Sequence, residues 1–451
     1  MKQTIPFLAL GLLAATGFFL AGPPAQGQPA EDDGTGSVRV EAQLEHGKLL
    51  AEKGGETFAR IVLEGKQTPA PTDRVPVSLT LVIDQSGSMA GEKIDHARRS
   101  AILALEQLLP GDRASVVAFS DGARVLVDRV VIGEQPLDDA RRAISALRDM
   151  GGTDMVAGLD VGGRQAKKLF EDRRTNRVLL LSDGQPNTEQ GLKAQVQQLA
   201  RQGILTTTLG IGRDYNEDLM SRLADAGLGN YYFIERPEMT ASIFDKELKT
   251  LASVVAKEAV VTISLKSGVV VEEVYGYDIS RGKDVVAIPV GDVYGGRKSD
   301  ILARVRFPAA TEGKAELLEV KVSYHDALAA RARKVSLPLA AHFTKDAAAV
   351  TASVVPAVAE KAEKVRTAFA LEQVTEAYAK GDKDRARSIV AEQKARLGSL
   401  KGRFAGTAVE KSAEAFEDEL DSLSAEAEAP AADAKVYSKK AKAAARAYKK
   451  R

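Results

Sequence analysis

Two segments of the chain, VSLTLVID at 77–84 and NRVLLLSD at 176–183, have the pattern of buried strands, and each ends in an aspartate. A strand that is apolar on both faces has to be covered on both faces, as the central strands of a parallel sheet are. Around them, further strand-like segments alternate with segments that have the apolar spacing of helices. Residues 77–255 are therefore predicted to form a doubly wound, Rossmann-like α/β domain with right-handed crossovers.

The elements of this domain can be placed from the same pattern. Strands are expected at 77–84, 113–120, 123–131, 176–183, 204–212 and 229–235. Helices are expected at 93–109, 137–148, 155–170, 190–202, 216–226 and 238–255.

The segments on either side of this domain have a different pattern of apolar residues and turns. Within 28–76, two strand-like segments at 37–45 and 56–65 are followed by a proline-rich linker. Residues 256–343 consist of short strands separated by Gly, Asp and Pro turns, which indicates an all-β sandwich. We expect the strands on both sides to join as one sandwich, with the α/β domain inserted between two of its strands.

The C-terminal region, 344–451, is rich in Ala, Glu, Lys and Arg and is expected to be helical. Gly381 followed by Asp382 predicts a break and an N-cap, and hence a helical hairpin. The end of the chain is acidic over 414–433 and then basic over 435–451. A solvated helix or tail is the favoured interpretation, and weak contact of the basic tail with an anionic lipid or polymer is the alternative.

The N-terminus has the features of a signal peptide over 1–27. Lys2 supplies a positive charge, an apolar run follows at 5–20, and Ala25-Gln26-Gly27 fits the small-x-small cleavage rule. The protein is therefore expected to be exported, to the periplasm, the cell surface or the medium, with an uncleaved anchor as the alternative. The chain has no cysteine, so its folding needs no disulfide and thiolate chemistry is excluded.

The pattern that points to chemistry is Asp84, Ser86 and Ser88, which form Asp-x-Ser-x-Ser after the first apolar strand. In doubly wound sheets, ligands bind at the carboxyl ends of the strands. Gly87 allows the tight backbone path by which one loop can direct the three side chains to one point. Hydroxyl and carboxylate oxygens suit Mg²⁺, whereas the imidazole and thiolate ligands that favour zinc are missing here.

Two further segments should complete the same crevice. Thr153 follows a Gly-Gly turn and precedes a helix, and Asp183 ends the second buried strand. Three neighbouring polar residues are interpreted as structural. Asp154 is taken as a helix N-terminal residue, Asp121 as a turn residue, and His96 as a surface or half-buried residue rather than a ligand.

Together these positions resemble the metal-ion-dependent adhesion site of the von Willebrand A (VWA) family, whose signature is Asp-x-Ser-x-Ser, then a Thr, then an Asp. All five positions match, and the strand order agrees across residues 77–255. Capping and turn residues without a metal are the alternative, but each of the five falls at an expected strand end or turn. The likeness extends to exported bacterial proteins with a VWA domain.

The resemblance implies a metal site formed by Asp84, Ser86, Ser88, Thr153 and Asp183. The two serines would bind the ion directly, the threonine directly or through water, and the two aspartates mostly through water. The expected ion is Mg²⁺, with Mn²⁺ or Ca²⁺ as alternatives. One coordination position would stay open for an Asp or Glu of a partner protein.

Three functions are compatible with this sequence. The first is an exported, non-catalytic adhesion or scaffold protein that binds a partner carboxylate through the ion. The second is a regulatory subunit that docks on an envelope enzyme, chaperone or transporter. The third, a hydrolase using Ser86 or a metal-bound water, is disfavoured because no His or Cys lies near the motif to act as a base. The net charge of +1 gives no attraction to nucleic acid.

Overall fold

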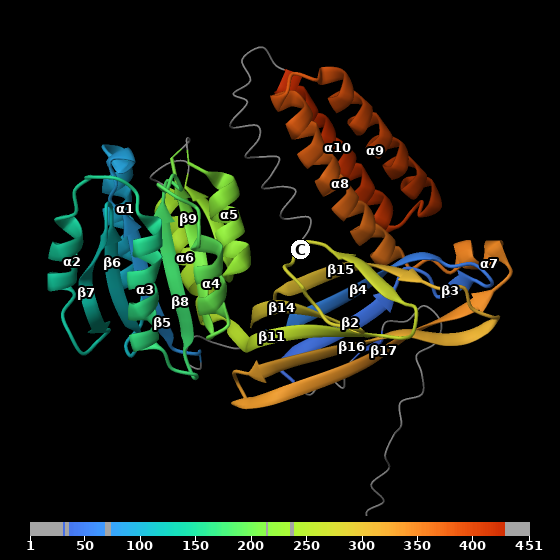
Figure 1. Ribbon diagram of the computed structural model, residues 1–451, viewed down its shortest axis with the longest axis horizontal. Coiled ribbons are helices and arrows are strands. Elements are labelled where there is room, and N and C mark those ends of the chain that lie inside the picture. Colours follow the sequence, from blue (N-terminus) through green and yellow to red (C-terminus); the bar gives the residue numbers. More distant parts are fainter. Residues whose placement is uncertain (1–29, 32–35, 68–73, 213–214, 235–238, 429–451) are drawn as a thin grey trace, which may run out of the picture.

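The computed structural model describes residues 30–31, 36–67, 74–212, 215–234 and 239–428. The signal peptide expected at 1–27 and the basic tail expected at 435–451 lie outside these residues. The chain forms an α/β domain, a β-sandwich beside it, and a helical bundle that projects from the sandwich (Figure 1). Within the described ranges, no helix is long and apolar enough to cross a membrane.

The α/β domain is built on a six-stranded sheet with the order β10-β9-β8-β5-β6-β7. The strands are β5 (Val77–Asp84), β6 (Arg113–Phe119), β7 (Ala123–Val131), β8 (Thr175–Ser182), β9 (Ile204–Ile211) and β10 (Leu228–Ile234). Neighbouring strands are parallel, except that β7 runs antiparallel to β6. Every residue of β5 and β8, the two strands with the clearest buried pattern, is buried.

Helices cover both faces of this sheet (Figure 1). One face carries α1 (Glu92–Glu106), α2 (Asp138–Ser145) and α6 (Met239–Ala252). The other carries α3 (Met155–Leu169), α4 (Leu192–Ala200) and α5 (Glu217–Ala226). The predicted doubly wound fold is confirmed, and it leaves the carboxyl ends of the central strands β5 and β8 side by side.

The last helix of this domain was predicted too long. It ends at Ala252, and a strand, β11 (Val254–Leu265), begins two residues later. Val254 and Val255 are β-branched and buried, and Val254 pairs with Tyr294 in the neighbouring strand. Pairing and burial in the sheet therefore decide the conformation of residues that helical spacing alone had placed in the helix.

The sandwich consists of two sheets. One has the order β1-β2-β4-β15-β12, and the other has the order β13-β14-β11-β16-β17-β3. The strands not yet named are β1 (Ala30–Glu31), β2 (Val38–Leu44), β3 (Lys48–Leu50), β4 (Gly55–Gly65), β12 (Val270–Val274), β13 (Ser280–Arg281), β14 (Val285–Tyr294), β15 (Lys298–Phe307), β16 (Gly313–Asp326) and β17 (Arg331–Thr344).

Strands from before and after the α/β domain belong to this one sandwich. β4 pairs antiparallel with β15, from Gly55 opposite Phe307 to Glu64 opposite Lys298. The two sheets share one apolar core, to which Ile61 of β4 and Ile263 of β11 both contribute. The α/β domain therefore sits as an insertion between β4 and β11.

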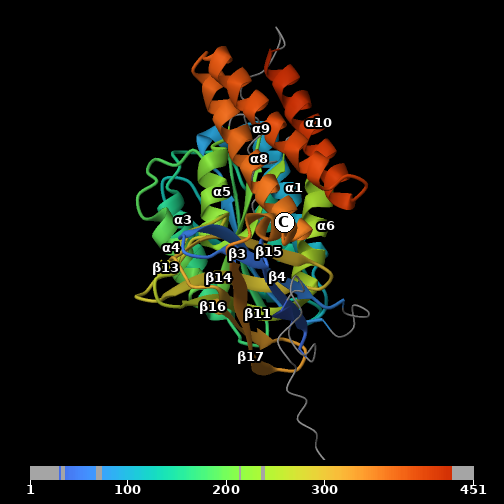
Figure 2. The ribbon, with the colours of Figure 1, turned by 90° about the vertical axis from the view of Figure 1, so that its right-hand side faces the viewer.

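The C-terminal region contains α7 (Ala347–Ala352), α8 (Pro356–Ala379), α9 (Lys383–Arg403) and α10 (Ala408–Glu428). Asp382 accepts a hydrogen bond from the N–H of Arg385 at 3.1 Å and caps α9, as its position after Gly381 predicted. The helical hairpin of α8 and α9 is completed by α10, whose Phe416 and Leu420 share an apolar cluster with Leu397 of α9 (Figure 2).

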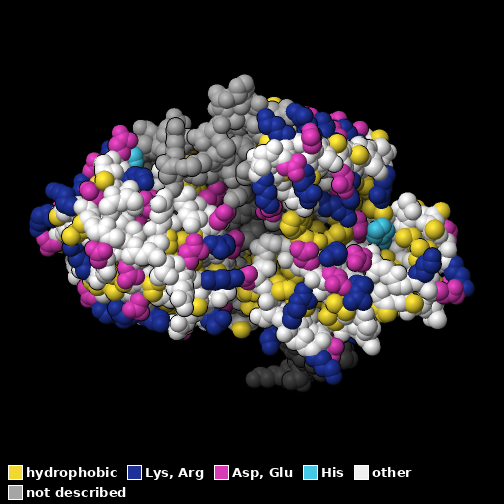
Figure 3. All heavy atoms as spheres, turned by 45° about the horizontal axis from the view of Figure 1, so that its top comes forward, with side chains coloured by type: hydrophobic (Ala, Val, Ile, Leu, Met, Phe, Trp, Pro, Cys, Tyr) yellow, Lys and Arg dark blue, Asp and Glu magenta, His cyan; other side chains and the backbone are white. Residues whose placement is uncertain are grey.

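The bundle is anchored to the sandwich through α8. Hydrophobic side chains gather where the two parts meet (Figure 3), and this cluster includes Phe58, Tyr275, Leu302, Val358, Ala362 and Val365. A buried ionic group lies beside the cluster. Arg60 donates to both oxygens of Asp300, at 2.8 and 2.9 Å, and the Lys361 ammonium of α8 lies 3.7 Å from the same carboxylate.

Candidate metal centre

Three loops meet at the carboxyl ends of β5 and β8. The loop after β5 is joined to the loop before α3 by two backbone hydrogen bonds, from Gly87 N–H to the Gly151 carbonyl at 3.0 Å and from Met150 N–H to the Gln85 carbonyl at 2.7 Å. The loop before α3 is joined in turn to the loop after β8 through Asn187. All five predicted site residues lie on these three loops or at the strand ends from which they leave.

Asp84 is the last residue of β5, and its side chain is fully buried. Its Oδ1 accepts a hydrogen bond from the N–H of Ser86 at 2.8 Å, and its Oδ2 accepts one from the Ser182 hydroxyl at 2.5 Å. Burial raises the pKa of Asp84 to about 6, although these hydrogen bonds oppose the shift, and the nearby charge of Asp183 adds to it. The carboxylate is therefore costly to keep charged unless a cation lies close by.

The two serine hydroxyls of the motif lie together. Ser86 Oγ is 3.1 Å from Ser88 Oγ, and either can be the donor. Ser86 is buried, whereas Ser88, in the single 3₁₀ turn Gly87–Met89, is exposed. One hydroxyl of the pair thus lies in the interior beside Asp84, and the other faces the surface from which a ligand would approach.

Asp183 directly follows Ser182, the last residue of β8, whereas the sequence predicted Asp183 itself as the strand end. Its side chain has no exposure, and its Oδ2 accepts a hydrogen bond from the Lys93 ammonium at 3.1 Å. Among the residues that the structure describes, its Oδ1 has no hydrogen-bond partner. An unsatisfied buried carboxylate oxygen is rare in folded proteins and carries a desolvation cost. An oxygen of this kind can accept a hydrogen bond from a water or bind a cation.

Thr153 lies in the loop before α3 and is buried. Its N–H donates to the Asn187 side chain at 3.1 Å, and its carbonyl accepts from the N–H of Asn187 at 2.9 Å. Asp154 caps α3 by accepting a hydrogen bond from the N–H of Ala157 at 2.9 Å, as the sequence predicted. Thr153 is thus held by backbone contacts to the loop that follows Asp183.

The residues gathered here fit a hard divalent ion. In the described part of the chain, no group of three or more His, Cys, Asp or Glu side chains lies close enough together to hold a metal. A metal at the ends of β5 and β8 therefore needs hydroxyl ligands in addition to the two aspartates. Hydroxyls, carboxylates and water are the ligands that Mg²⁺ accepts, and the unsatisfied Oδ1 of Asp183 is the observation that favours an ion here.

Sequence reasoning missed three side chains that organise this site. Ser182 binds Asp84 across the two strands, and Lys93 of α1 binds Asp183. Asp121, interpreted as a turn residue only, accepts a hydrogen bond from the N–H of Gly152 at 2.7 Å and so holds the Gly-Gly loop. A Cβ at Gly151, whose φ is +67°, would overlap the Asp121 carboxylate, which explains why a glycine is needed at that position.

His96 was also placed incorrectly. It was expected at the surface or half-buried, but it is buried within α1, with 7% of its surface exposed. The reason is that α1 presents a wide face to the sheet, on which Ala97, Ser100 and Ala101 are buried as well. Because these neighbouring side chains are small, the His96 ring also fits into the buried face of the helix.

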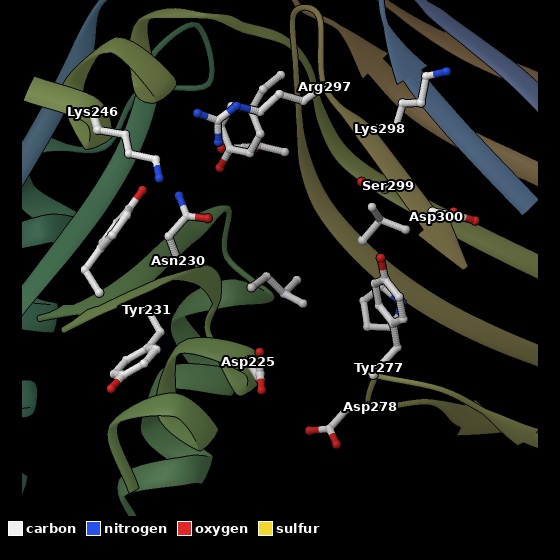
Figure 4. Close-up of a pocket in the computed structure, with 18 of the residues that line it drawn as sticks. Asp225, Asn230, Tyr231, Lys246, Tyr277, Asp278, Arg297, Lys298, Ser299 and Asp300 are labelled. Carbon is white, nitrogen blue, oxygen red and sulfur yellow. The ribbon is translucent and has the colours of Figure 1, made fainter. Parts of the chain in front are cut away.

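A second concave region lies between the α/β domain and the sandwich. This cleft, of about 750 Å³, is bordered by edge strand β10 on one side and by β14 and the start of β15 on the other. Figure 4 shows Asn230 and Tyr231 on the α/β side and Tyr277 and Asp278 on the sandwich side. None of the five predicted metal ligands lines the cleft, so it is separate from the site at the ends of β5 and β8.

Comparison with known proteins agrees with this fold. Residues 78–246 match the model of the von Willebrand factor type A domain. An uncharacterized protein of Synechocystis sp. is 25% identical over 282 residues, which are 59% of this chain and 66% of that protein. Inter-alpha-trypsin inhibitor heavy chain H3 of Rattus norvegicus is 30% identical over 172 residues, which are 36% of this chain and 19% of that protein.

The fold is similar to a solved structure over a longer stretch. The structure named von Willebrand factor type A from Catenulispora acidiphila has a TM-score of 0.71 at 19% identity, and the match covers 92% of this chain and 97% of that one. The sequence matches span less than two thirds of the Synechocystis and rat proteins, whereas the fold match includes most of the sandwich and helical regions as well.

Proposed function

We propose that the protein is a metal-dependent interaction protein, an adhesion or scaffold module without catalytic activity. The match of residues 78–246 to the model of the von Willebrand factor type A domain supports this proposal. In this proposal Asp84, Ser86, Ser88, Thr153 and Asp183 hold Mg²⁺, and an Asp or Glu of a partner protein completes the coordination. When bound, the ion supplies a positive charge for that carboxylate. The rat relative named as the heavy chain of an inhibitor supports a role in an assembly.

The observation that carries the proposal is the pair of buried aspartates at the ends of β5 and β8. Asp84 and Asp183 are both without exposure, and in the described part of the chain Asp183 Oδ1 has no hydrogen-bond partner. Two buried carboxylates at one point are unfavourable unless positive charge compensates them, and the Lys93 ammonium on Asp183 supplies only one such charge. Ser86 and Ser88 would contribute uncharged hydroxyl oxygens as ligands. A divalent ion bound by hydroxyls stays only partly neutralised and can attract a carboxylate of another protein.

A non-catalytic role follows from how these carboxylates are used. A serine nucleophile needs a base to accept its proton, and Asp84, the carboxylate next to Ser86, already binds Ser182 through Oδ2 and the N–H of Ser86 through Oδ1. Asp183 is paired with Lys93. These contacts support a role for the groups around Ser86 in holding a cation rather than in activating the serine.

We also propose that this interaction takes place outside the cytoplasm, as the signal-like segment at 1–27 predicts. A fusion of residues 1–36 to a reporter enzyme that is active only after export tests this directly. Activity is expected with the native segment and should be lost when the apolar run at 5–20 carries two lysines.

The central experiment is capture of partner proteins by the full-length protein in Mg²⁺ and in EDTA. Partners are expected to bind in Mg²⁺, to elute with EDTA, and to be lost with Asp84→Ala. Asp139→Ala, which removes an exposed carboxylate at the start of α2, is the matched control and should retain them. Capture that is equal in EDTA, or unaffected by Asp84→Ala, would contradict the proposal.

A further inference from the structure

Lys93 lies at the centre of the candidate metal site, although no part of the sequence motif includes it. It is the second residue of α1, and its ammonium is 3.1 Å from Asp183 Oδ2 and 3.0 Å from the carbonyl oxygen of Ser88. Lys93 therefore connects the loop after β5 with the end of β8, the same two segments that a metal ion would connect.

The path of the lysine side chain is shaped by the surrounding backbone. A Cβ at Gly212, where φ is +85°, would come within 2.8 Å of Lys93 Cε. The aliphatic part of the lysine thus crosses the end of β9 closely, and 27% of the side chain is exposed. This arrangement directs the ammonium inward, to a carboxylate that has no exposure of its own.

The charges of the site show what the ammonium does. Asp84 is contacted by the neutral hydroxyl of Ser182 and the backbone N–H of Ser86, neither of which carries a charge. The Lys93 ammonium is bound to the neighbouring Asp183, so it supplies one positive charge to a pair of buried carboxylates. Loss of the ammonium would leave the Asp183 carboxylate, which has no exposure, without its charged partner, and this is unfavourable. Lys93 therefore stabilises the site.

We propose that Lys93 is a resident cation that competes with the divalent ion for Asp183. This inference deepens the proposed function and rests on it. The ammonium neutralises Asp183 and keeps the strand ends in place. Asp183 would also be a ligand of a bound ion, so the Lys93 ammonium would give up this carboxylate and turn toward solvent, in an exchange of one cation for another.

The exchange has a consequence for affinity. An ammonium a few ångströms from a bound ion repels it and also occupies one of its carboxylates. Lys93 therefore lowers the affinity for the ion and at the same time makes the empty site stable. A lysine that merely tied the loop to α1 would act in the opposite direction, because its loss would loosen the site and weaken ion binding.

The test is a titration of the full-length protein with Mn²⁺ and Mg²⁺, by calorimetry and by the Mn²⁺ electron paramagnetic resonance signal. Lys93→Gln removes the charge and keeps a hydrogen-bond donor for the Ser88 carbonyl. We expect it to bind the ion about tenfold more tightly and to melt at a lower temperature in EDTA. Lys93→Arg keeps the charge and should stay close to the wild type in both measurements.

A second measurement follows the ammonium itself. The ¹⁵Nζ resonance of Lys93, assigned by its loss in the Gln variant, should shift when Mg²⁺ is added to the wild-type protein. Lys93→Met, which keeps the aliphatic contact with Gly212, replaces the Gln variant if that one does not fold. Ion affinity that is unchanged or weaker in a folded neutral variant, or a resonance that stays in place on saturation, would overturn the inference.

The outcomes separate this inference from the function on which it rests. If the wild type binds Mn²⁺ in an Asp183-dependent way and the neutral variants show no gain, only the role of Lys93 is wrong. If neither the wild type nor the neutral variants bind Mn²⁺, the proposed metal-dependent function fails, and the role of Lys93 fails with it.

Discussion

The hydroxyl of Ser182 donates a hydrogen bond of 2.5 Å to Oδ2 of Asp84 and joins the carboxyl ends of two neighbouring parallel strands. The same Ser182 Oγ accepts a hydrogen bond from the N–H of Gly184 at 2.9 Å. One serine thus holds the carboxylate of the first motif segment and the loop of the last. This cross-strand contact organises the candidate site.

Ser182→Ala should destabilise the protein when no metal is present. The change leaves Asp84 Oδ2 buried without its partner, which costs about 1–3 kcal/mol of the free energy of unfolding. Urea denaturation in EDTA measures this loss. Ser145→Ala, at an exposed position at the end of α2, is the control and should change the unfolding free energy by less than about 0.5 kcal/mol. Equal stability of the two variants would show that the contact contributes nothing.

Asp183→Asn should abolish the stabilisation of the protein by Mg²⁺. A ligand that binds only the folded state stabilises it by about 2.7 kcal/mol at one hundred times its dissociation constant. The wild type should therefore melt at a higher temperature in Mg²⁺ than in EDTA, and the Asn variant should melt at the same temperature in both. Calorimetric scans measure this, and Asp139→Asn is expected to respond to Mg²⁺ like the wild type.

More of the fold than of the candidate site could be predicted from the sequence. The alternation of apolar strands and helices predicted the doubly wound sheet, because side chains on both faces of its central strands are buried, such as Leu81 on one face and Leu180 on the other. The helical spacing of apolar residues gave the wrong end for α6. At Val254, pairing with a neighbouring strand ends the helix earlier than the spacing predicts. The short β3 was not predicted, and neither was the packing of α10 on the helical hairpin, although the C-terminal region was expected to be helical. Both depend on contacts with distant segments.

Prediction of the site from the sequence was limited in the same way, by contacts between distant segments. The motif residues are recognisable because Asp84, Ser86 and Ser88 are close in sequence and follow one strand. Lys93 and Ser182 come to the site from a helix and from a neighbouring strand, and only the folded chain shows which carboxylate each one contacts. The one available signal for Ser182 was its place beside Asp183 at a strand end.

Asp121→Ala should weaken ion binding without abolishing it. The Asp121 carboxylate accepts the hydrogen bond from the N–H of Gly152 and so holds the loop that carries Thr153. Its loss should loosen that loop and lower ion affinity on the order of fivefold, the effect of losing a hydrogen bond of about 1 kcal/mol. Asp121→Asn keeps the acceptor oxygen and should retain most of the affinity. A titration with Mn²⁺ compares the two, and equal affinities for Ala and Asn would exclude this role.

Lys361 should make the stability of the protein depend on pH in the alkaline range. It is buried between α8 and the sandwich, and burial lowers its pKa from 10.5 to about 8, although Asp300 partly opposes the shift. Below pH 8 the lysine is charged in both the folded and the unfolded state, and the full cost of burying the charge is present. Between about pH 8 and 10.5 the folded state has lost the proton and the unfolded state has kept it. Stability therefore rises with pH in this window.

The measurement is the free energy of unfolding of the wild type minus that of Lys361→Met, at intervals from pH 7 to pH 9.5, because groups common to both proteins cancel in the difference. Arg60 keeps Asp300 paired in the variant, so the methionine leaves no carboxylate alone. At pH 7 the variant should be as stable as the wild type or more stable, since an apolar side chain replaces a buried charge. The difference should then move in favour of the wild type as pH rises, by at most about 3 kcal/mol. A difference that stays constant over this range would mean that the buried lysine keeps its ordinary pKa, because Asp300 fully offsets the cost of burying the charge.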